Sequence, residues 1–186
     1  MANIAFIAER RFSDLVRSSY PKLISPKYME YRKIEKSDDP SLAVIIRKNL
    51  KAHKLDIPGT AYFDDNLDHL SDYYLADADK RFYLVATEDE SVVGGIGVDK
   101  LDLFENCAEL QKLYLDDSVK GHGYGYEMIR IIEDKARELG YSKIYLETHT
   151  NLPTAIHMYE KSGYREIDKP EGVIHSTMNK FFIKDL

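Results

Sequence analysis

Apolar residues recur along the chain at two spacings, and these spacings predict its strands and helices. Short runs rich in β-branched and aromatic residues predict strands, whereas apolar residues three or four positions apart predict one face of a helix. The expected order is a strand, two helices, three strands, a helix, a strand, a helix and two strands. Strands are expected at residues 28–34, 82–86, 92–98, 108–115, 143–147, 164–168 and 176–186, and helices from residue 39, around 67–74, over 126–139 and over 153–161.

Residues that start or stop regular structure mark several of these boundaries. Asp39 is a typical helix cap, and Pro40 after it is tolerated at a first helical position. Gly140 and Gly163 each follow a helical pattern and supply its stop. The polar segment 88–91 between two apolar runs predicts a hairpin.

Residues 1–27 precede this pattern and are predicted to form a helical arm, ended by Pro21 and Pro26. The arm has an apolar face, which must be buried either on the domain that follows or on a second subunit of a homodimer. Both arrangements stay open. We therefore expect an N-terminal helical arm over 1–27 and one domain over 28–186.

The composition predicts a single globular domain. The chain has 186 residues, of which 44% are hydrophobic and 31% are charged. A net charge of -6 disfavours a nucleic acid partner and favours cationic acceptors, although an acidic balance is also simply common. No apolar stretch approaches the roughly 20 residues of a membrane span, and the apolar run in residues 1–7 is too short for a signal peptide. We therefore expect no membrane partner and a cytoplasmic location.

The cysteine and histidine positions predict neither a disulfide nor a metal site. Cys107 is the one cysteine, so we expect a buried small hydrophobe in a reducing compartment. His149 and His157 lie eight residues apart, with no clustered carboxylate or thiolate at ligand spacing.

A glycine-rich loop, Lys120-Gly121-His122-Gly123-Tyr124-Gly125, lies between a predicted strand and the helix from Tyr126. Glycine at every second position lets the amides turn toward a ligand, and the helix start favours negative charge, so the loop predicts a phosphate site. Gly125 is not followed by the Lys-Ser or Lys-Thr of a nucleoside triphosphate loop. Tyr126 stands where a dinucleotide fingerprint needs its third glycine. Both of those ligand classes are therefore excluded.

The context of this loop is more specific than the loop, since glycines between two elements are often simple turn formers. Blocks 108–125 and 146–164 together resemble the acetyl-CoA-binding core of the GNAT superfamily of N-acetyltransferases, and the order of elements matches over 28–186. The resemblance implies an α+β fold with an α/β-type mixed, twisted sheet of about seven strands and about four helices. It also implies that the loop from Lys120 to Gly125 wraps the pyrophosphate of coenzyme A, and we expect the cofactor-binding residues to extend to Tyr126. Lys120 departs from the Arg or Gln that the family has at this position. Its ammonium would hold the phosphate as a point charge, without the planar, two-pronged hydrogen bonding of a guanidinium.

Tyr159 is the expected general acid. It lies four residues after Ala155 on one helical face, where the alanine leaves space for the cofactor and the phenol points at the cofactor's sulfur. The resemblance implies the same role, and the alternative is a core aromatic beside Ile156. Asn151 stands one position earlier than the family's asparagine, and we expect it either to bond the pantetheine arm or to cap the helix that follows.

Two carboxylates are candidates for the general base, which an alkylamine needs because it is mostly protonated at pH 7. Glu147 ends its strand twelve residues before the tyrosine, a spacing that the resemblance associates with a catalytic glutamate. Glu109 is the competitor. Period-two alternation places it on one strand face with Gln111, Leu113 and Leu115. Either carboxylate is alternatively a solvated group at a strand end.

The resemblance implies that Leu113, Tyr114 and Leu115 act through their backbone. In the family this strand splays from its neighbour, so that its free amides and carbonyls bond the pantetheine arm and one amide faces the thioester oxygen. One donor of this kind contributes about 3 to 4 kcal/mol to catalysis.

Aspartates and aromatic residues crowd the segment between the first and second predicted strands, which is expected to select the acceptor. Charge and cation-π contact would bind an amine there, and a solvated acidic helix face is the alternative. The residues are Asp64, Asp65, Asp68, Asp72, Asp77 and Asp79 with Tyr62, Phe63, Tyr73 and Tyr74.

The sequence therefore predicts an acetyltransferase that uses acetyl-CoA as co-substrate, no metal, and the primary amine of a small molecule as acceptor. We expect direct transfer in a ternary complex, with a general base and a tyrosine general acid. Two alternatives stay open. One is a non-catalytic, acetyl-CoA-binding regulatory module, and the other is an acetyltransferase that acts on a protein or peptide amine.

Overall fold

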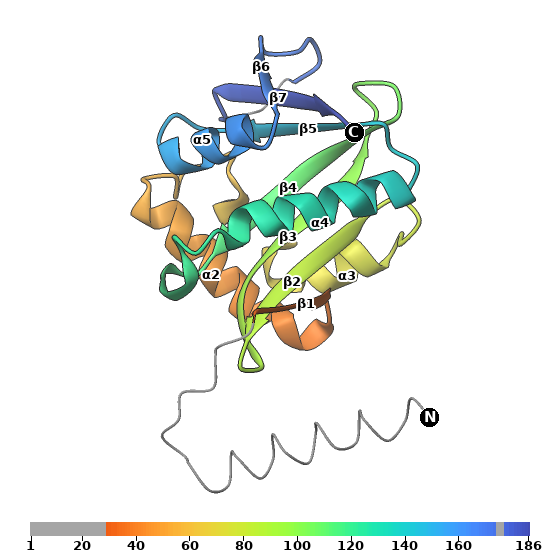
Figure 1. Ribbon diagram of the computed structural model, residues 1–186. Helices are drawn as coiled ribbons and strands as arrows, with labels where there is room; N and C mark the ends of the chain where they lie inside the picture. Colours follow the sequence, from red (N-terminus) through yellow and green to blue (C-terminus); the bar gives the residue numbers. More distant parts are fainter. Residues whose placement is uncertain (1–28, 174–176) are drawn as a thin grey trace, which may run out of the picture.

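The computed structural model describes residues 29–173 and 177–186, which form one mixed sheet with helices on both faces (Figure 1). The strand order is β1-β2-β3-β4-β5-β7-β6; β4 and β5 are parallel neighbours, and the other neighbouring pairs are antiparallel. The strands are β1 (Met29–Lys33), β2 (Phe82–Glu88), β3 (Ser91–Leu101), β4 (Cys107–Leu115), β5 (Lys143–Thr148), β6 (Arg165–Ile167) and β7 (Lys180–Asp185). The helices are α2 (Asp39–Ala52), α3 (Leu70–Leu75), α4 (Tyr124–Glu138) and α5 (Pro153–Lys161), with short 3-10 turns at Lys36–Asp38, Ala61–Phe63, Leu67–His69 and Asp117–Val119.

The expected fold is confirmed, and the element boundaries differ by a few residues. β2 and β3 extend to a two-residue turn, Asp89-Glu90, whose φ angles of 48° and 67° give the twist that a tight hairpin needs. The last two strands are shorter than expected, and α4 begins at Tyr124 instead of Tyr126. The predicted arm over 1–27 lies outside the described residues.

Two apolar clusters hold the helices against opposite faces of the sheet. α4 and α5 cover one face, where Ile129 of α4 and Ile144 of β5 belong to the same buried cluster (Figure 1). α2 and α3 cover the other face, where Leu42 of α2 packs in a cluster with Tyr83 of β2. Because both faces are covered, β2 is a nearly continuous apolar run, with residues 83–87 buried.

β4 contains a bulge at Lys112, which has a positive φ of 51°. Its pairing with β3 skips at this point, so that Lys112 and Leu113 together stand opposite a single residue of β3. A lysine has no intrinsic preference for this left-handed conformation, so the surrounding sheet imposes it.

The bulge reverses the alternation of side chains along β4. Leu113 and Leu115 pack with the cluster under α4. Gln111 instead bonds the hydroxyl of Tyr74 from α3, and it also bonds Glu109. The prediction that Leu113 and Leu115 share a strand face with Glu109 and Gln111 is therefore wrong, because the period-two alternation is interrupted at the bulge.

β4 and β5 pair over only three residues and then separate. The last pair is Glu109 with Tyr145, so residues 110–115 of β4 have no strand partner on that side. Figure 1 shows the two strands running apart beyond this point. The sheet thus has an internal opening with unpaired backbone groups along one edge.

Within the described ranges, no helix combines the length and apolar character needed to cross a bilayer. The same residues include no group of three or more His, Cys, Asp or Glu side chains placed to hold a metal ion. Cys107 is buried, and burial raises the pKa of its thiol to about 11.

Candidate active site

A cleft of about 980 Å³ opens where β4 and β5 separate. Its walls come from the end of α2, residues 59–61, β4, the glycine loop, the first turn of α4, and α5. His122 and Asn151 are not part of its lining. The structure brings these predicted site residues together around it: Glu109, Leu113, Tyr114, Leu115, Lys120, Gly121, Gly123, Tyr124, Gly125, Tyr126, Glu147, Ala155 and Tyr159.

The glycine loop presents a run of unbonded amides at one wall of the cleft. Gly121 and Gly123 have φ angles of 83° and 87°, which favour glycine. No acceptor among the described residues bonds the amides of residues 121–125. The Gly123 carbonyl accepts the amides of Tyr126 and Glu127 and so starts α4. Successive amides at a helix start attract an anion through their hydrogens and through the helix dipole.

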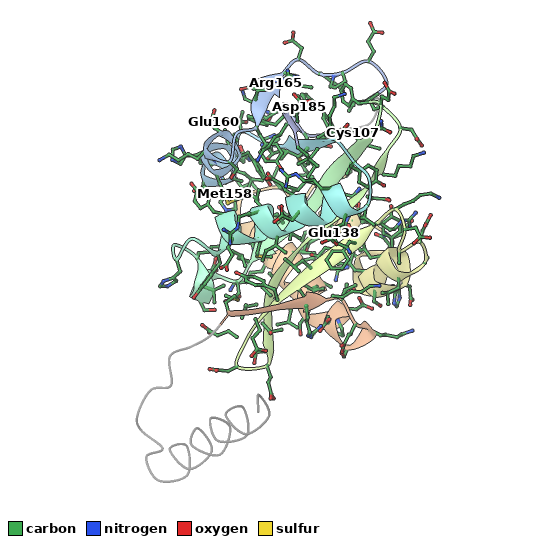
Figure 2. All side chains as sticks on the ribbon, turned by 45° about the vertical axis from the view of Figure 1, so that its right-hand side comes forward. Cys107, Glu138, Met158, Glu160, Arg165 and Asp185 are labelled. Atoms are coloured by element: carbon green, nitrogen blue, oxygen red, sulfur yellow. The ribbon has the colours of Figure 1, made fainter. Side chains whose placement is uncertain are left out.

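Gly125 serves helix packing as well. A Cβ atom at this position would lie 2.6 Å from Sδ of Met158. Met158 lies where α5 meets the first turn of α4 (Figure 2). A methyl group at this position would require the flexible end of the Met158 side chain to move, so the glycine leaves room for Met158 between two cleft walls.

Lys120 is held beside the loop by two hydrogen bonds. Its ammonium donates to Oδ1 of Asn49 at 2.6 Å and to Oδ1 of Asp117 at 2.7 Å. The hydrogen bond from Lys120 is the largest cause of a lowered pKa at Asp117, and Lys48 adds to it. The positive charge expected at the anion site is therefore present, but a carboxylate partly offsets it.

Asn49 was not predicted as a site residue, although it connects three parts of the site. It is buried, and its amide nitrogen donates to the carbonyls of Ile45 and Leu115 at 2.9 and 3.0 Å. With its bond to Lys120, it ties α2 to the end of β4 and to the glycine loop. The available signal was a polar residue on the apolar face of α2, four positions after Ile45.

Tyr159 combines the two roles considered for it. Its ring packs in the core under α4, with its centroid 5.8 Å from that of Tyr164, and only 6% of the residue is exposed. It also lines the cleft together with Ala155, one turn earlier. Burial raises the pKa of the phenol well above its ordinary value, so the hydroxyl is protonated at neutral pH. No described residue accepts that proton.

Glu109 and Glu147 line the cleft from neighbouring strands. Glu147 Oε1 accepts a hydrogen bond from the Tyr145 hydroxyl at 2.9 Å, and Glu109 Oε2 accepts one from Gln111 Nε2 at 2.6 Å. Burial raises the pKa of Glu109, the Gln111 bond opposes this, and the charge of Glu147 raises it further. A carboxyl of raised proton affinity beside a second carboxylate is an arrangement suited to proton transfer.

Asn151 connects two loops outside the cleft. Its Nδ2 donates to the His53 carbonyl at 3.0 Å, and its own carbonyl lies 3.1 Å from His53 Nδ1. The residue that caps α5 is Leu152, without a side-chain hydrogen bond, so the capping role expected for Asn151 is wrong. His122 is exposed, with its ring centroid 5.9 Å from that of Tyr124.

The acidic segment between β1 and β2 is mainly a surface of ion pairs. Asp68, for example, accepts two hydrogen bonds from Arg47 at 2.6 and 2.7 Å. Among the aspartates of this segment, Asp64 alone lines the cleft, where it accepts a 2.6 Å bond from Lys112. The solvated-face alternative therefore describes most of the segment.

The end of the cleft away from the glycine loop has walls that the sequence did not indicate. Leu101 and Leu103 come from the end of β3 and the loop after it, whereas Val173 and Met178 come from the connection between β6 and β7. Leu101 and Val173 also pack on the cluster that contains Tyr145. This end of the cleft thus combines an apolar wall with the two carboxylates.

Comparison with known proteins places this geometry in context. A sequence model of the acetyltransferase (GNAT) family matches residues 49–164. An uncharacterized N-acetyltransferase of Escherichia coli, YjgM, is 33% identical over 147 residues, covering 78% of this chain and 87% of that protein. A GNAT-family acetyltransferase from Staphylococcus aureus has a TM-score of 0.74 at 21% identity, covering 86% of this chain and 99% of that chain. The PaiA N-acetyltransferase of Thermoplasma acidophilum, solved with coenzyme A, has a TM-score of 0.69 at 18% identity and the same two coverages.

Proposed function

The chain belongs to the acetyltransferase (GNAT) family, and on this premise we propose that it transfers the acetyl group of acetyl-CoA to the primary amine of a small molecule. The observation that carries the proposal is the run of amides at residues 121–125, which have no acceptor among the described residues. A diphosphate fits such a run, because its several oxygens each accept from a different amide. Acetyl-CoA has a diphosphate at one end of its pantetheine arm and the thioester at the other.

In this proposal the pantetheine arm lies along the unpaired edge of β4. The carbonyl of Leu115 already accepts a hydrogen bond from Asn49, which leaves the Leu115 amide and the backbone groups of Leu113 and Tyr114 for this role. Their groups lie between the glycine loop and Glu109, along the edge that β5 leaves open. An amide there that faces the thioester oxygen stabilises the developing oxyanion by about 3 to 4 kcal/mol.

Transfer is direct and occurs in a ternary complex. The amine nitrogen attacks the acetyl carbon, so a C–N bond forms while the C–S bond breaks. A carboxylate, Glu109 or Glu147, takes the proton that the nitrogen loses, and Tyr159 gives its proton to the departing thiolate. Because burial raises the pKa of Tyr159, the phenol keeps its proton until the thiolate develops. Solvent then returns the proton from the carboxyl to the tyrosine.

The far end of the cleft favours a small cationic acceptor with an apolar carbon skeleton. Glu109 and Glu147 supply negative charge, and Leu101 and Val173 supply apolar surface. The volume of about 980 Å³ is at the upper end of the range for small-molecule sites, which suits a coenzyme arm together with a compact acceptor.

Two titrations test the proposal. Calorimetry measures the binding of coenzyme A. Thiol release from acetyl-CoA measures acetyl transfer to a panel of acceptors: alkylamines, arylalkylamines, diamines, amino acids and a peptide with a free α-amine. We expect saturable binding and turnover of alkylamines or arylalkylamines but not of the peptide. Turnover of the peptide alone would favour a protein acceptor, and binding without any turnover would favour the regulatory module. No heat with coenzyme A would refute the proposal.

A further inference from the structure

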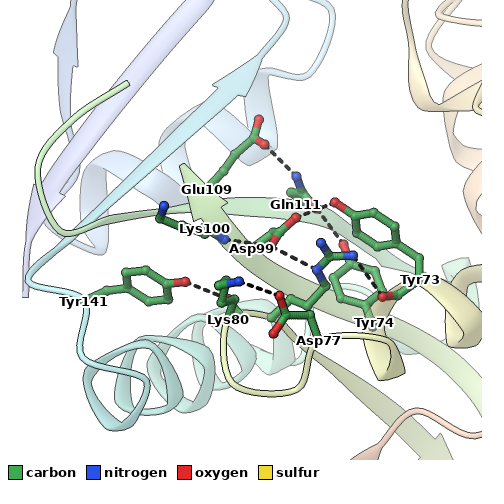
Figure 3. Close-up of polar contacts among 10 residues, drawn as sticks. Tyr73, Tyr74, Asp77, Lys80, Asp99, Lys100, Glu109, Gln111 and Tyr141 are labelled. Carbon is green, nitrogen blue, oxygen red and sulfur yellow. Dashed lines mark hydrogen bonds and ion pairs between the residues drawn. The ribbon is translucent and has the colours of Figure 1, made fainter. Parts of the chain in front are cut away.

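A partly buried chain of hydrogen bonds runs from α3 to Glu109 (Figure 3). The Tyr74 hydroxyl donates to Oε1 of Gln111 at 2.7 Å, and Nε2 of Gln111 donates to Oε2 of Glu109 at 2.6 Å. Tyr74 is fully buried, whereas Gln111 and Glu109 line the cleft. Glu109 Oε1, the other carboxylate oxygen, has no donor among the described residues.

The tyrosine fixes the orientation of the glutamine amide. Burial raises the pKa of Tyr74 well above its ordinary value, so its hydroxyl is protonated and donates. A primary amide has one acceptor and one donating end. When the acceptor end of Gln111 faces Tyr74, the donating end must face Glu109, and the opposite orientation would set a carbonyl oxygen against the carboxylate.

A glycine makes room for this contact. Gly97 of β3 pairs directly with Gln111. A Cβ atom on Gly97 would lie 2.6 Å from the Tyr74 hydroxyl oxygen and 2.7 Å from the ring of Tyr83. The Tyr74 hydroxyl therefore occupies the space that a side chain at position 97 would fill, and only glycine at that position lets it reach Gln111.

Charged groups on three strands surround Glu109. Burial is the largest influence on its pKa and raises it, and the charges of Glu147 on β5 and Asp99 on β3 act in the same direction. The Gln111 bond and the charge of Lys112 on β4 lower it. The tyrosines that face it, Tyr73 and Tyr74 from α3 and Tyr145 from β5, have raised pKa values and are neutral.

We propose that Gln111, oriented by Tyr74, is a positioning residue that holds Glu109 as the general base of acetyl transfer. The inference rests on the proposed function and chooses between its two carboxylates. The bonded Oε2 anchors the carboxylate, and Oε1 takes the proton from the acceptor nitrogen as the C–N bond forms and the C–S bond breaks. Tyr159 gives its proton to the thiolate, so the proton count balances.

The test measures the protonation of Glu109 directly. Protein labelled with ¹³C at the glutamate side-chain carboxyls is titrated by NMR, and the Glu109 signal is assigned by its loss in Glu109→Gln. Gln111→Met keeps the side-chain volume and removes the donor, and Tyr74→Phe keeps the ring and releases the amide. Tyr73→Phe is the matched control, because it removes the neighbouring hydroxyl, which bonds Asp99.

We expect Gln111→Met to move the Glu109 midpoint upward by about one pH unit, Tyr74→Phe to move it by less in the same direction, and Tyr73→Phe to leave it in place. With an amine that turns over, the acidic limb of kcat against pH should move with the midpoint, while the KM for acetyl-CoA stays constant.

Three results separate this inference from the proposed function. An unchanged midpoint in both Gln111→Met and Tyr74→Phe would overturn the positioning role, even in an active enzyme. A moved midpoint without a moved kcat profile would overturn the role of Glu109 as base. A moved midpoint in a protein that binds no coenzyme A would uphold the hydrogen-bond chain and refute the acetyl-transfer proposal.

Discussion

Replacing Gly123 with alanine tests the anion-binding loop through the backbone alone. Gly123 has a φ of 87°, and a Cβ atom there would meet nothing within 4 Å, so the new methyl group causes no clash. Holding alanine in this left-handed conformation costs about 1 to 2 kcal/mol. If the backbone relaxes instead, neighbouring amides turn away from the diphosphate. Loss of one charge-assisted hydrogen bond, about 1.5 to 3 kcal/mol, weakens coenzyme A binding roughly 10- to 100-fold.

Gly140→Ala is the matched control for this substitution. Gly140 has a φ of 89°, is equally open, and follows the opposite end of α4, about 22 Å along the helix. Urea unfolding should show similar losses of stability in both variants, whereas calorimetry should show weaker coenzyme A binding only in Gly123→Ala. Pantetheine, which lacks the diphosphate, should bind Gly123→Ala and wild type alike. Equal coenzyme A affinity in the two variants would refute the reasoning.

Three further outcomes follow from the site. Tyr159→Phe should lower kcat for amine acetylation by about 100-fold or more with little change in the KM for acetyl-CoA, and a wild-type kcat would exclude Tyr159 as the acid. Asn49→Ala removes the donor to the buried Ile45 carbonyl and to the partly buried Leu115 carbonyl. It should lower the free energy of unfolding in urea by about 1 to 3 kcal/mol, and an unchanged value would contradict these bonds. Gly125→Ala should cost no more than about 1 kcal/mol of the same quantity, because the flexible end of the Met158 side chain can move aside; a loss of about 3 kcal/mol or more would show that the two helices themselves must separate.

Local patterns were sufficient to predict the order of elements and the position of the loop. Met128, Ile132 and Ala136 recur at helical spacing, and all three are fully buried in α4. This worked because one continuous face of the helix meets the sheet. The loop could be predicted for a similar reason. Gly121 and Gly123 both have positive φ angles, a local backbone property that favours glycine at these two positions.

Features imposed by distant parts of the chain could not be predicted. Lys112 occupies a bulge because the opposing strand is one residue shorter there, and nothing local to a lysine favours that conformation. Asn151 bonds His53, the residue that follows α2, instead of capping α5. Asn49 joins the site only because α2 packs against the end of β4. Each depends on which elements become neighbours, and periodicity carries no information about that.

The short junction between β4 and β5 divides the sheet into two units that are joined by few backbone hydrogen bonds. Three residue pairs join an antiparallel unit of β1 to β4 with a second unit of β5 to β7. A ligand that binds in the gap between β4 and β5 replaces part of the missing strand pairing and contacts both units. Binding therefore stabilises the junction, and local opening of the junction lets ligands enter and leave while the strand pairs within each unit stay intact. Amide hydrogens at the junction should exchange more slowly once a ligand is bound.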